Sequence, residues 1–137
     1  MIYQKQDKFI VRVYFEDTDA GGIIYHSQYL NFAERARTEF LRQRNLEQSN
    51  LKKSFGMSFV VKKLTIDYLR FACLDDLLTV VTKVSEISKA KVVFSQNIYK
   101  NNLVITNINV TVVCLNKNGK ISRMNDLIYD SLKLKES

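Results

Sequence analysis

Residues 27–45, "SQYLNFAERARTEFLRQRN", decide the fold because they predict one long amphipathic helix. Apolar side chains recur at helical spacing along this segment, at Leu30, Ala33, Ala36, Phe40 and Leu41. Charged side chains fall largely on the other side, at Glu34, Arg35, Arg37, Arg42 and Arg44. Ser27 stands where it would cap the first turn. A helix of this kind must bury its apolar face against another element.

The rest of the chain offers strands rather than a second long helix for that face. Residues 9–15 predict a strand before the helix, and a polar loop follows the helix. Four long strands are then predicted, at residues 57–72, 76–88, 91–100 and 103–115. Their short turns, such as Asn101 with Asn102, predict an antiparallel meander. Residues 125–134 predict a short terminal helix with Asn125 as its cap.

This order of elements predicts an α+β fold in which a strongly curved antiparallel sheet wraps round the long central helix. That is the hotdog arrangement, and an unrelated α+β sandwich is the alternative. The length of 137 residues suits a single domain, residues 1–137, with a substantial core. No internal repeat, low-complexity tract or linker divides the sequence.

The composition excludes several classes of protein. With 46% hydrophobic and 26% charged residues the chain has a globular composition. No apolar run has the length of a membrane-spanning helix, and the N-terminal residues lack the apolar region of a signal peptide, so we expect a cytoplasmic protein. The net charge is +7, but the basic residues are scattered without a basic, aromatic-rich block, so we expect no nucleic-acid partner.

The cysteines and the single histidine argue against a metal site. Cys73 and Cys114 lie in apolar text without CxxC or Cys/His spacing, so we expect two buried free thiols. With one histidine, His26, and no cysteine pair, the sequence predicts no zinc site.

Residues 16–26, "EDTDAGGIIYH", gather acids, glycines and the histidine in one loop. Such text most often forms a solvated turn. Three details favour a pocket instead. The loop is held between the first strand and the helix, Gly21 and Gly22 permit a close backbone approach, and the "IIY" that follows suits a pocket wall.

The position of this loop suggests acyl transfer chemistry. The first N–H groups of a helix lack intrahelical partners and lie at the positive end of its dipole, so they can stabilise a developing oxyanion. A carboxylate nearby can act as a general base toward water or as a nucleophile. His26 would either position a group by a hydrogen bond or take part in catalysis. The chain has no GxSxG motif, no cysteine beside a base and no P-loop.

Residues 11–42, "VRVYFEDTDAGGIIYHSQYLNFAERARTEFLR", resemble the opening of the YbgC-type acyl-CoA thioesterases, in the 4-hydroxybenzoyl-CoA thioesterase-like branch of hotdog proteins. The DTD-x-x-G core, the YH pair and the ERARTEFLR helix occur in the expected order. Residues 57–80, "MSFVVKKLTIDYLRFACLDDLLTV", resemble the next strand of the family and the turn after it. The resemblance covers nearly the whole chain and implies an enzyme that hydrolyses acyl-CoA thioesters.

The resemblance also implies roles for single residues. The catalytic aspartate of the family matches Asp19 rather than Asp17, and whether it acts as nucleophile or as base stays open. The backbone donors that polarise the thioester carbonyl match the region of Tyr25 and His26, and His26 matches an assisting histidine. Many relatives have two tyrosines before the acids, whereas the second aromatic here is Phe15.

Substrate-binding residues are expected in three places. They are Gly22, Ile23 and Tyr25 in the loop, Val60 and Val61 on the next strand, and Lys89 and Lys91, with Lys62 and Lys63 as further candidates. The lysines would hold the phosphates of coenzyme A, although each of them is more often a solvated surface residue. No separate cofactor is expected, because coenzyme A is part of the substrate.

The resemblance implies that two chains pair edge to edge and form the active site between them, with a dimer of dimers as the expected assembly. Acyl carrier protein, and a peripheral contact with the membrane or with lipid-synthesis proteins, are further candidate partners. The alternative function is a non-catalytic hotdog module that binds acyl groups or acyl carrier protein. A hotdog dehydratase fits the DTD loop poorly. The sequence leaves the acyl chain length and aromaticity open.

Overall fold

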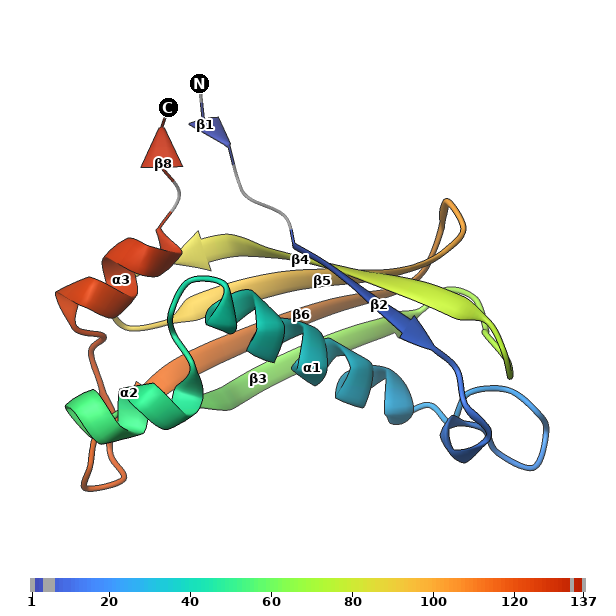
Figure 1. Ribbon diagram of the computed structural model, residues 1–137, viewed down its shortest axis with the longest axis horizontal. Helices are drawn as coiled ribbons and strands as arrows, with labels where there is room; N and C mark the ends of the chain where they lie inside the picture. The colour runs from blue at the N-terminus through green and yellow to red at the C-terminus, as the bar shows by residue number, and fades with distance from the viewer. Residues whose placement is uncertain (1, 4–6, 134, 137) are drawn as a thin grey trace.

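The structure is a computed structural model that describes residues 2–3, 7–133 and 135–136. An antiparallel sheet lies across one side of the long helix α1 (Gln28–Arg42), as Figure 1 shows. The strands of the sheet are β2 (Asp7–Arg12), β3 (Ser58–Tyr68), β4 (Leu77–Ile87), β5 (Val92–Lys100), β6 (Leu103–Leu115) and the short β7 (Ile121–Ser122). The predicted α+β hotdog fold is confirmed, and the sheet is open rather than closed into a barrel.

The order of strands in space differs from the predicted meander. The main path runs β2-β4-β5-β6-β3, and β7 pairs with β6. Strands β4, β5 and β6 do follow one another through short turns, but β3 pairs with β6 and not with β4. The place beside β4 is taken by β2, whose Asp7 lies opposite Thr82 and whose Arg12 lies opposite Leu77. Strand β3 is therefore left at an edge of the sheet.

Helix α1 buries its apolar face against the sheet, as predicted. Its buried side chains are Tyr29, Phe32, Ala33, Ala36, Phe40 and Leu41. The Phe40 ring meets the Phe94 ring of β5 edge to face, with centroids 5.5 Å apart. Ser27 occupies the N-cap position, but its side chain makes no capping hydrogen bond, so that detail of the prediction is wrong.

Three local elements depart from, or refine, the predicted ones. The first strand ends at Arg12, because the Asp17 carboxylate accepts the Tyr14 amide at 2.8 Å and turns the chain into a 3-10 turn, η1 (Phe15–Asp17). The predicted polar loop contains a helix, α2 (Gln48–Phe55), which ends at Gly56 in the left-handed region. The terminal helix α3 (Asp126–Leu132) begins as predicted, where the Asn125 side chain accepts the Ile128 amide at 2.9 Å.

Strands β1 (Ile2–Tyr3) and β8 (Lys135–Glu136) form a separate antiparallel pair.

Cys114 is buried in β6, and burial raises the pKa of its thiol to about 11. Cys73 is exposed, contrary to the prediction, because it lies in the connection that leaves the sheet after β3.

None of the helices among the described residues has the length and apolarity needed to cross a membrane. Within residues 2–3, 7–133 and 135–136, no three His, Cys, Asp or Glu side chains are grouped so that they would hold a metal ion.

Candidate active site

The acidic loop folds into a tight turn that is fixed to the segment between β3 and β4. The Asp19 amide donates to the Ile23 carbonyl at 2.9 Å, and the Gly22 amide donates to the Asp19 carbonyl at 3.0 Å. Gly22 has a φ of 82°, a left-handed conformation that favours glycine. The Ile24 amide then donates to the Ala72 carbonyl at 2.9 Å, which ties the loop to the segment after β3. The loop is therefore a fixed part of the fold and not a free surface turn.

The Asp19 side chain is held by the same turn. Its Oδ1 accepts the Gly21 amide at 2.8 Å. A Cβ atom on Gly21 would lie 3.2 Å from this oxygen, so a glycine allows the close approach. No other hydrogen bond to the Asp19 carboxylate occurs in the described part of the chain, which leaves Oδ2 available to a ligand.

Asp19 lines a cleft of about 380 Å³ at the start of α1. The cleft brings together three of the predicted site residues, Asp19, Ile23 and His26. Ile24, from the "IIY" segment expected in a pocket wall, also lines it, whereas sequence reasoning missed the other three lining residues, Tyr29, Tyr68 and Phe71. The walls are thus mainly apolar and aromatic, with one carboxylate and one imidazole among them.

Two tyrosines join the cleft to the start of the helix. Tyr29 is buried and its hydroxyl accepts the Ala72 amide at 3.2 Å. Its ring meets the Tyr68 ring edge to face at 5.6 Å, and the Tyr68 hydroxyl donates to the His26 carbonyl at 2.7 Å. Burial raises the pKa of both phenols, so both stay neutral near pH 7 and Tyr68 remains a donor.

The hydrogen bonds at the helix start show which backbone amides are free to act as donors. The Tyr25 amide is already used, because it donates to the Asp17 carbonyl at 2.9 Å. The amides of His26 and Ser27 have no hydrogen-bond acceptor within the residues that the structure describes. Helix α1 begins at Gln28, so these two free amides lie at the positive end of its dipole.

Comparisons with known proteins identify the family. The family model described as the thioesterase-like superfamily matches residues 13–132. The chain belongs to the thioesterase-like superfamily. It is 51% identical over 107 residues to the acyl-CoA thioesterase YbgC of Haemophilus influenzae, with 78% of this chain and 79% of that protein covered. It is 43% identical over 106 residues to the acyl-CoA thioester hydrolase YbgC of Escherichia coli O157:H7, with 77% and 78% covered.

A solved structure confirms the thioesterase-like fold. The crystal structure of a probable thioesterase from Bartonella henselae is 33% identical to this chain and superposes with a TM-score of 0.84. The match covers 88% of this chain and 100% of that one.

The two aspartates of the DTD sequence have different surroundings in this thioesterase-like fold. Asp17 is 5% exposed, and its carboxylate accepts the Tyr14 amide at 2.8 Å and the Gln28 side-chain amide at 2.7 Å. It therefore joins the end of β2 to the start of α1. Asp19 is exposed to the cleft. The pattern DTD alone does not reveal this difference.

The other predicted substrate-binding residues are placed in several regions of this thioesterase-like chain. Gly22 and Tyr25 belong to the loop, and the exposed Tyr25 ring lies 4.5 Å from the His26 ring. Val60 and Val61 lie on the edge strand β3, are 39% and 44% exposed, and line a different cavity.

The two predicted lysines lie far from Asp19 within one chain. Lys89 and Lys91 follow the end of β4. The acidic loop contacts the segment that precedes the beginning of β4. Eleven strand residues separate these ends, about 36 Å. Lys89 forms an ion pair with Asp126, and the Lys91 ammonium lies 3.5 Å from Glu86. Their contact with coenzyme A stays a prediction that requires a second chain.

Proposed function

We propose that this chain is an acyl-CoA thioesterase that releases free coenzyme A and a carboxylic acid. The observation that carries the proposal is that a carboxylate with a free oxygen, Asp19 Oδ2, lines an apolar cleft at a helix start with unpaired amides. The names of the Haemophilus and Escherichia relatives support the same activity. A carboxylate base and free backbone donors beside an apolar cleft are the groups that thioester hydrolysis requires.

The proposed reaction begins with Asp19. As a general base, its carboxylate takes a proton from water while the water oxygen attacks the thioester carbon. The carbonyl oxygen becomes an oxyanion that the free amides of His26 and Ser27 stabilise. The C–S bond then breaks, the leaving sulfur of coenzyme A takes the proton that Asp19 accepted, and the acid is released. As a nucleophile, Asp19 would instead attack the thioester carbon and displace the sulfur of coenzyme A, and water would then hydrolyse the resulting mixed anhydride.

We further propose that the working site needs two chains, within a homodimer that assembles into a homotetramer. Strand β3 has a neighbour on one side only in the described sheet, and Val60 and Val61 on this strand are exposed. A bare edge of eleven residues readily pairs with another strand. A two-fold antiparallel pairing of residues 58–68 places the start of β3 in one chain beside its end in the other.

This pairing would bring the distant lysines close to the cleft of the other chain. The start of β3 and the turn between β4 and β5 lie at the same end of the sheet, because Ser58 and Val92 both lie beside the end of β6. Lys89 and Lys91 of one chain would therefore approach the Asp19 cleft of the other. Their ammonium groups suit the phosphates of coenzyme A.

The test is thiol release by the purified protein from a panel of acyl-CoAs of different chain length and aromaticity. We expect turnover that depends on the acyl group. Tight binding of acyl-CoA without thiol release would instead support the non-catalytic acyl-binding alternative. The absence of both binding and release over the whole panel would contradict the proposal.

Replacing His26 by alanine should lower turnover by an intermediate amount. The side chain lines the cleft but is not the group with the free carboxylate, so we expect a loss on the order of ten- to a thousand-fold in kcat. The measurement is thiol release with circular dichroism as the control for folding. An unchanged rate would make His26 structural, and a loss equal to that of an Asp19 variant would make it a primary catalytic group.

A further inference from the structure

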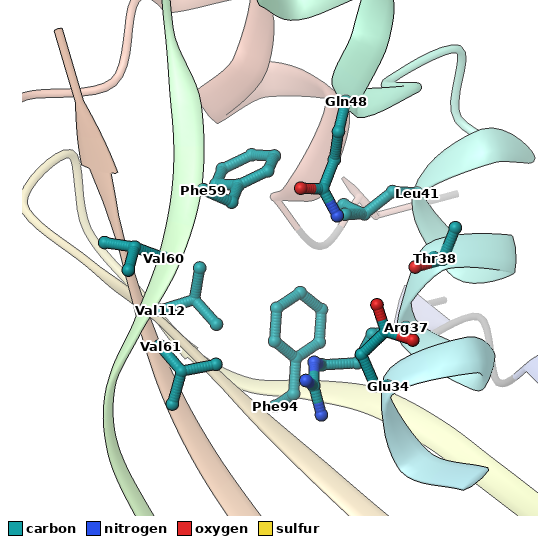
Figure 2. Close-up of a pocket in the computed structure, with 10 residues that line it drawn as sticks. All are labelled: Glu34, Arg37, Thr38, Leu41, Gln48, Phe59, Val60, Val61, Phe94 and Val112. Atoms are coloured by element: carbon teal, nitrogen blue, oxygen red, sulfur yellow. The ribbon is translucent and has the colours of Figure 1, made fainter. Parts of the chain in front are cut away.

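A second cavity opens between α1 and the edge strand β3 (Figure 2). Its volume is about 140 Å³, and its walls include Phe59, Val61, Phe94 and Val112. A cavity of roughly 150 Å³ is large enough to hold a benzene molecule. The apolar part of a small organic group therefore fits here.

One cation enters this cavity beside its apolar wall. Arg37 extends from α1 toward the sheet beside Phe94, although the sequence pattern had placed it with the solvated side of the helix (Figure 2). The guanidinium is half-buried, and burial lowers its pKa from the ordinary value. Arginine nevertheless stays charged in proteins. No carboxylate forms an ion pair with Arg37 among the residues that the structure describes.

The guanidinium is held in place by a buried amide. Arg37 Nη1 donates to Gln96 Oε1 at 2.9 Å, and Gln96 is 0% exposed. The Gln96 side-chain nitrogen donates to the Ala33 carbonyl at 2.8 Å and to Thr82 Oγ1 at 2.9 Å. These two bonds fix which end of the amide faces Arg37. One N–H of the guanidinium is thus used for positioning, and others remain for an acceptor in the cavity.

Glu34 is the acidic residue nearest in sequence on this side of the helix. It lines the same cavity but is exposed, and its charge raises the pKa of Arg37 from a distance beyond ion-pair range. A half-buried cation without a direct counter-ion is costly. A carboxylate on a ligand would supply the missing partner, and arginine binds carboxylates with two parallel hydrogen bonds.

We propose that the Arg37 cavity receives the far end of the acyl group and selects acyl chains that end in a carboxylate. This inference rests on the proposed function. Within one chain Arg37 lies eight residues beyond Tyr29, about 12 Å along the helix. In the proposed β3 pairing, residues 59–61 of one chain lie beside the Tyr68 end of the other. The Arg37 cavity then continues the Asp19 cleft of the partner subunit.

The experiment compares acyl-CoAs of equal length with and without a terminal carboxylate, such as octanoyl-CoA with suberoyl-CoA and hexanoyl-CoA with adipoyl-CoA. Thiol release gives the ratio of kcat/KM within each pair. We expect the carboxylate member to be favoured about ten-fold or more for at least one length. Arg37→Met should remove this preference, Arg37→Lys should keep part of it, and Glu34→Gln should increase it by removing a repelling charge.

Arg42→Met is the matched control, because Arg42 is on the same helix, is exposed and is paired with Glu39. It should leave the ratio unchanged. Equal rates for both members of every pair, or an unchanged ratio in Arg37→Met, would overturn the proposal. Light scattering that shows dissociation of the oligomer in Arg37→Met would also overturn it, because Arg37 would then contact a second copy of the chain and not the ligand.

A binding measurement separates this inference from the proposed function. Calorimetric titration of suberoyl-CoA and octanoyl-CoA reports the carboxylate preference even in a protein that releases no thiol. Preferential binding that Arg37→Met removes, without turnover, would uphold the Arg37 site and contradict the hydrolase. Turnover without any carboxylate preference in binding or rate would uphold the hydrolase and contradict the Arg37 site.

Discussion

Replacing Asp19 by asparagine should abolish thioester hydrolysis while the protein stays folded and oligomeric. The expected loss in kcat is on the order of a thousand-fold or more, because an amide can neither take a proton from water nor attack the thioester. The asparagine oxygen can still accept the Gly21 amide that now binds Asp19 Oδ1, so the turn should survive. Thiol release measures the loss, and circular dichroism and light scattering check the fold and the assembly.

Asp17→Asn is the matched control for this prediction. It removes the same charge two residues away, but Asp17 is buried and lies outside the cleft. Its two acceptor bonds, to the Tyr14 amide and to Gln28, cannot both be kept by an amide without rearrangement. We therefore expect a stability loss of about 1–3 kcal/mol and much higher residual activity than in Asp19→Asn. Equal losses of activity in the two variants would refute the assignment.

Mixing two inactive variants should restore activity. The first variant is Asp19→Asn, and the second is Val61→Trp, which fills the cavity beside β3. If each site takes Asp19 from one chain and Val61 from the other, a mixed dimer contains one intact site. With equal amounts and free exchange, about a quarter of the wild-type activity should return.

The mixing experiment depends on both variants remaining oligomeric. Light scattering on each variant alone provides that control, and unfolding and refolding them together ensures exchange of subunits. No recovery from two variants that do exchange would show that Asp19 and Val61 do not act in one shared site. A monomer with full activity would contradict the two-chain proposal altogether.

Local patterns in the sequence predicted most elements of the fold but not all of their neighbours. The alternation of side chains gives the period of a strand, and the bounds of β4, β5 and β6 follow it closely. The pairing of β3 with β6 depends instead on the fact that β2, and not β3, pairs with β4. No local pattern in the sequence indicates which of the two strands pairs there. Helix α2 was missed because its face buries only Leu51.

The candidate site was predictable where it is local in sequence and not where the fold assembles it. The loop from Glu16 to His26 stood out by composition, and the structure does place Asp19, Ile23 and His26 together. Tyr68 and Phe71 come from more than forty residues away and reach the cleft only because β3 ends there. Arg37 resembled any other charge on a helix, since only tertiary contact with Gln96 reveals that it points inward.

The hydrogen bonds at the start of α1 also fix the rotation of two peptide planes. A carbonyl and the next amide share one rigid plane. The Tyr25 carbonyl accepts the Gln28 amide at 2.8 Å, which holds the plane that carries the His26 N–H. The His26 carbonyl accepts the Tyr68 hydroxyl at 2.7 Å, which holds the plane that carries the Ser27 N–H. Both free donors are therefore locked against a peptide flip, one by the helix itself and the other by a side chain of the edge strand.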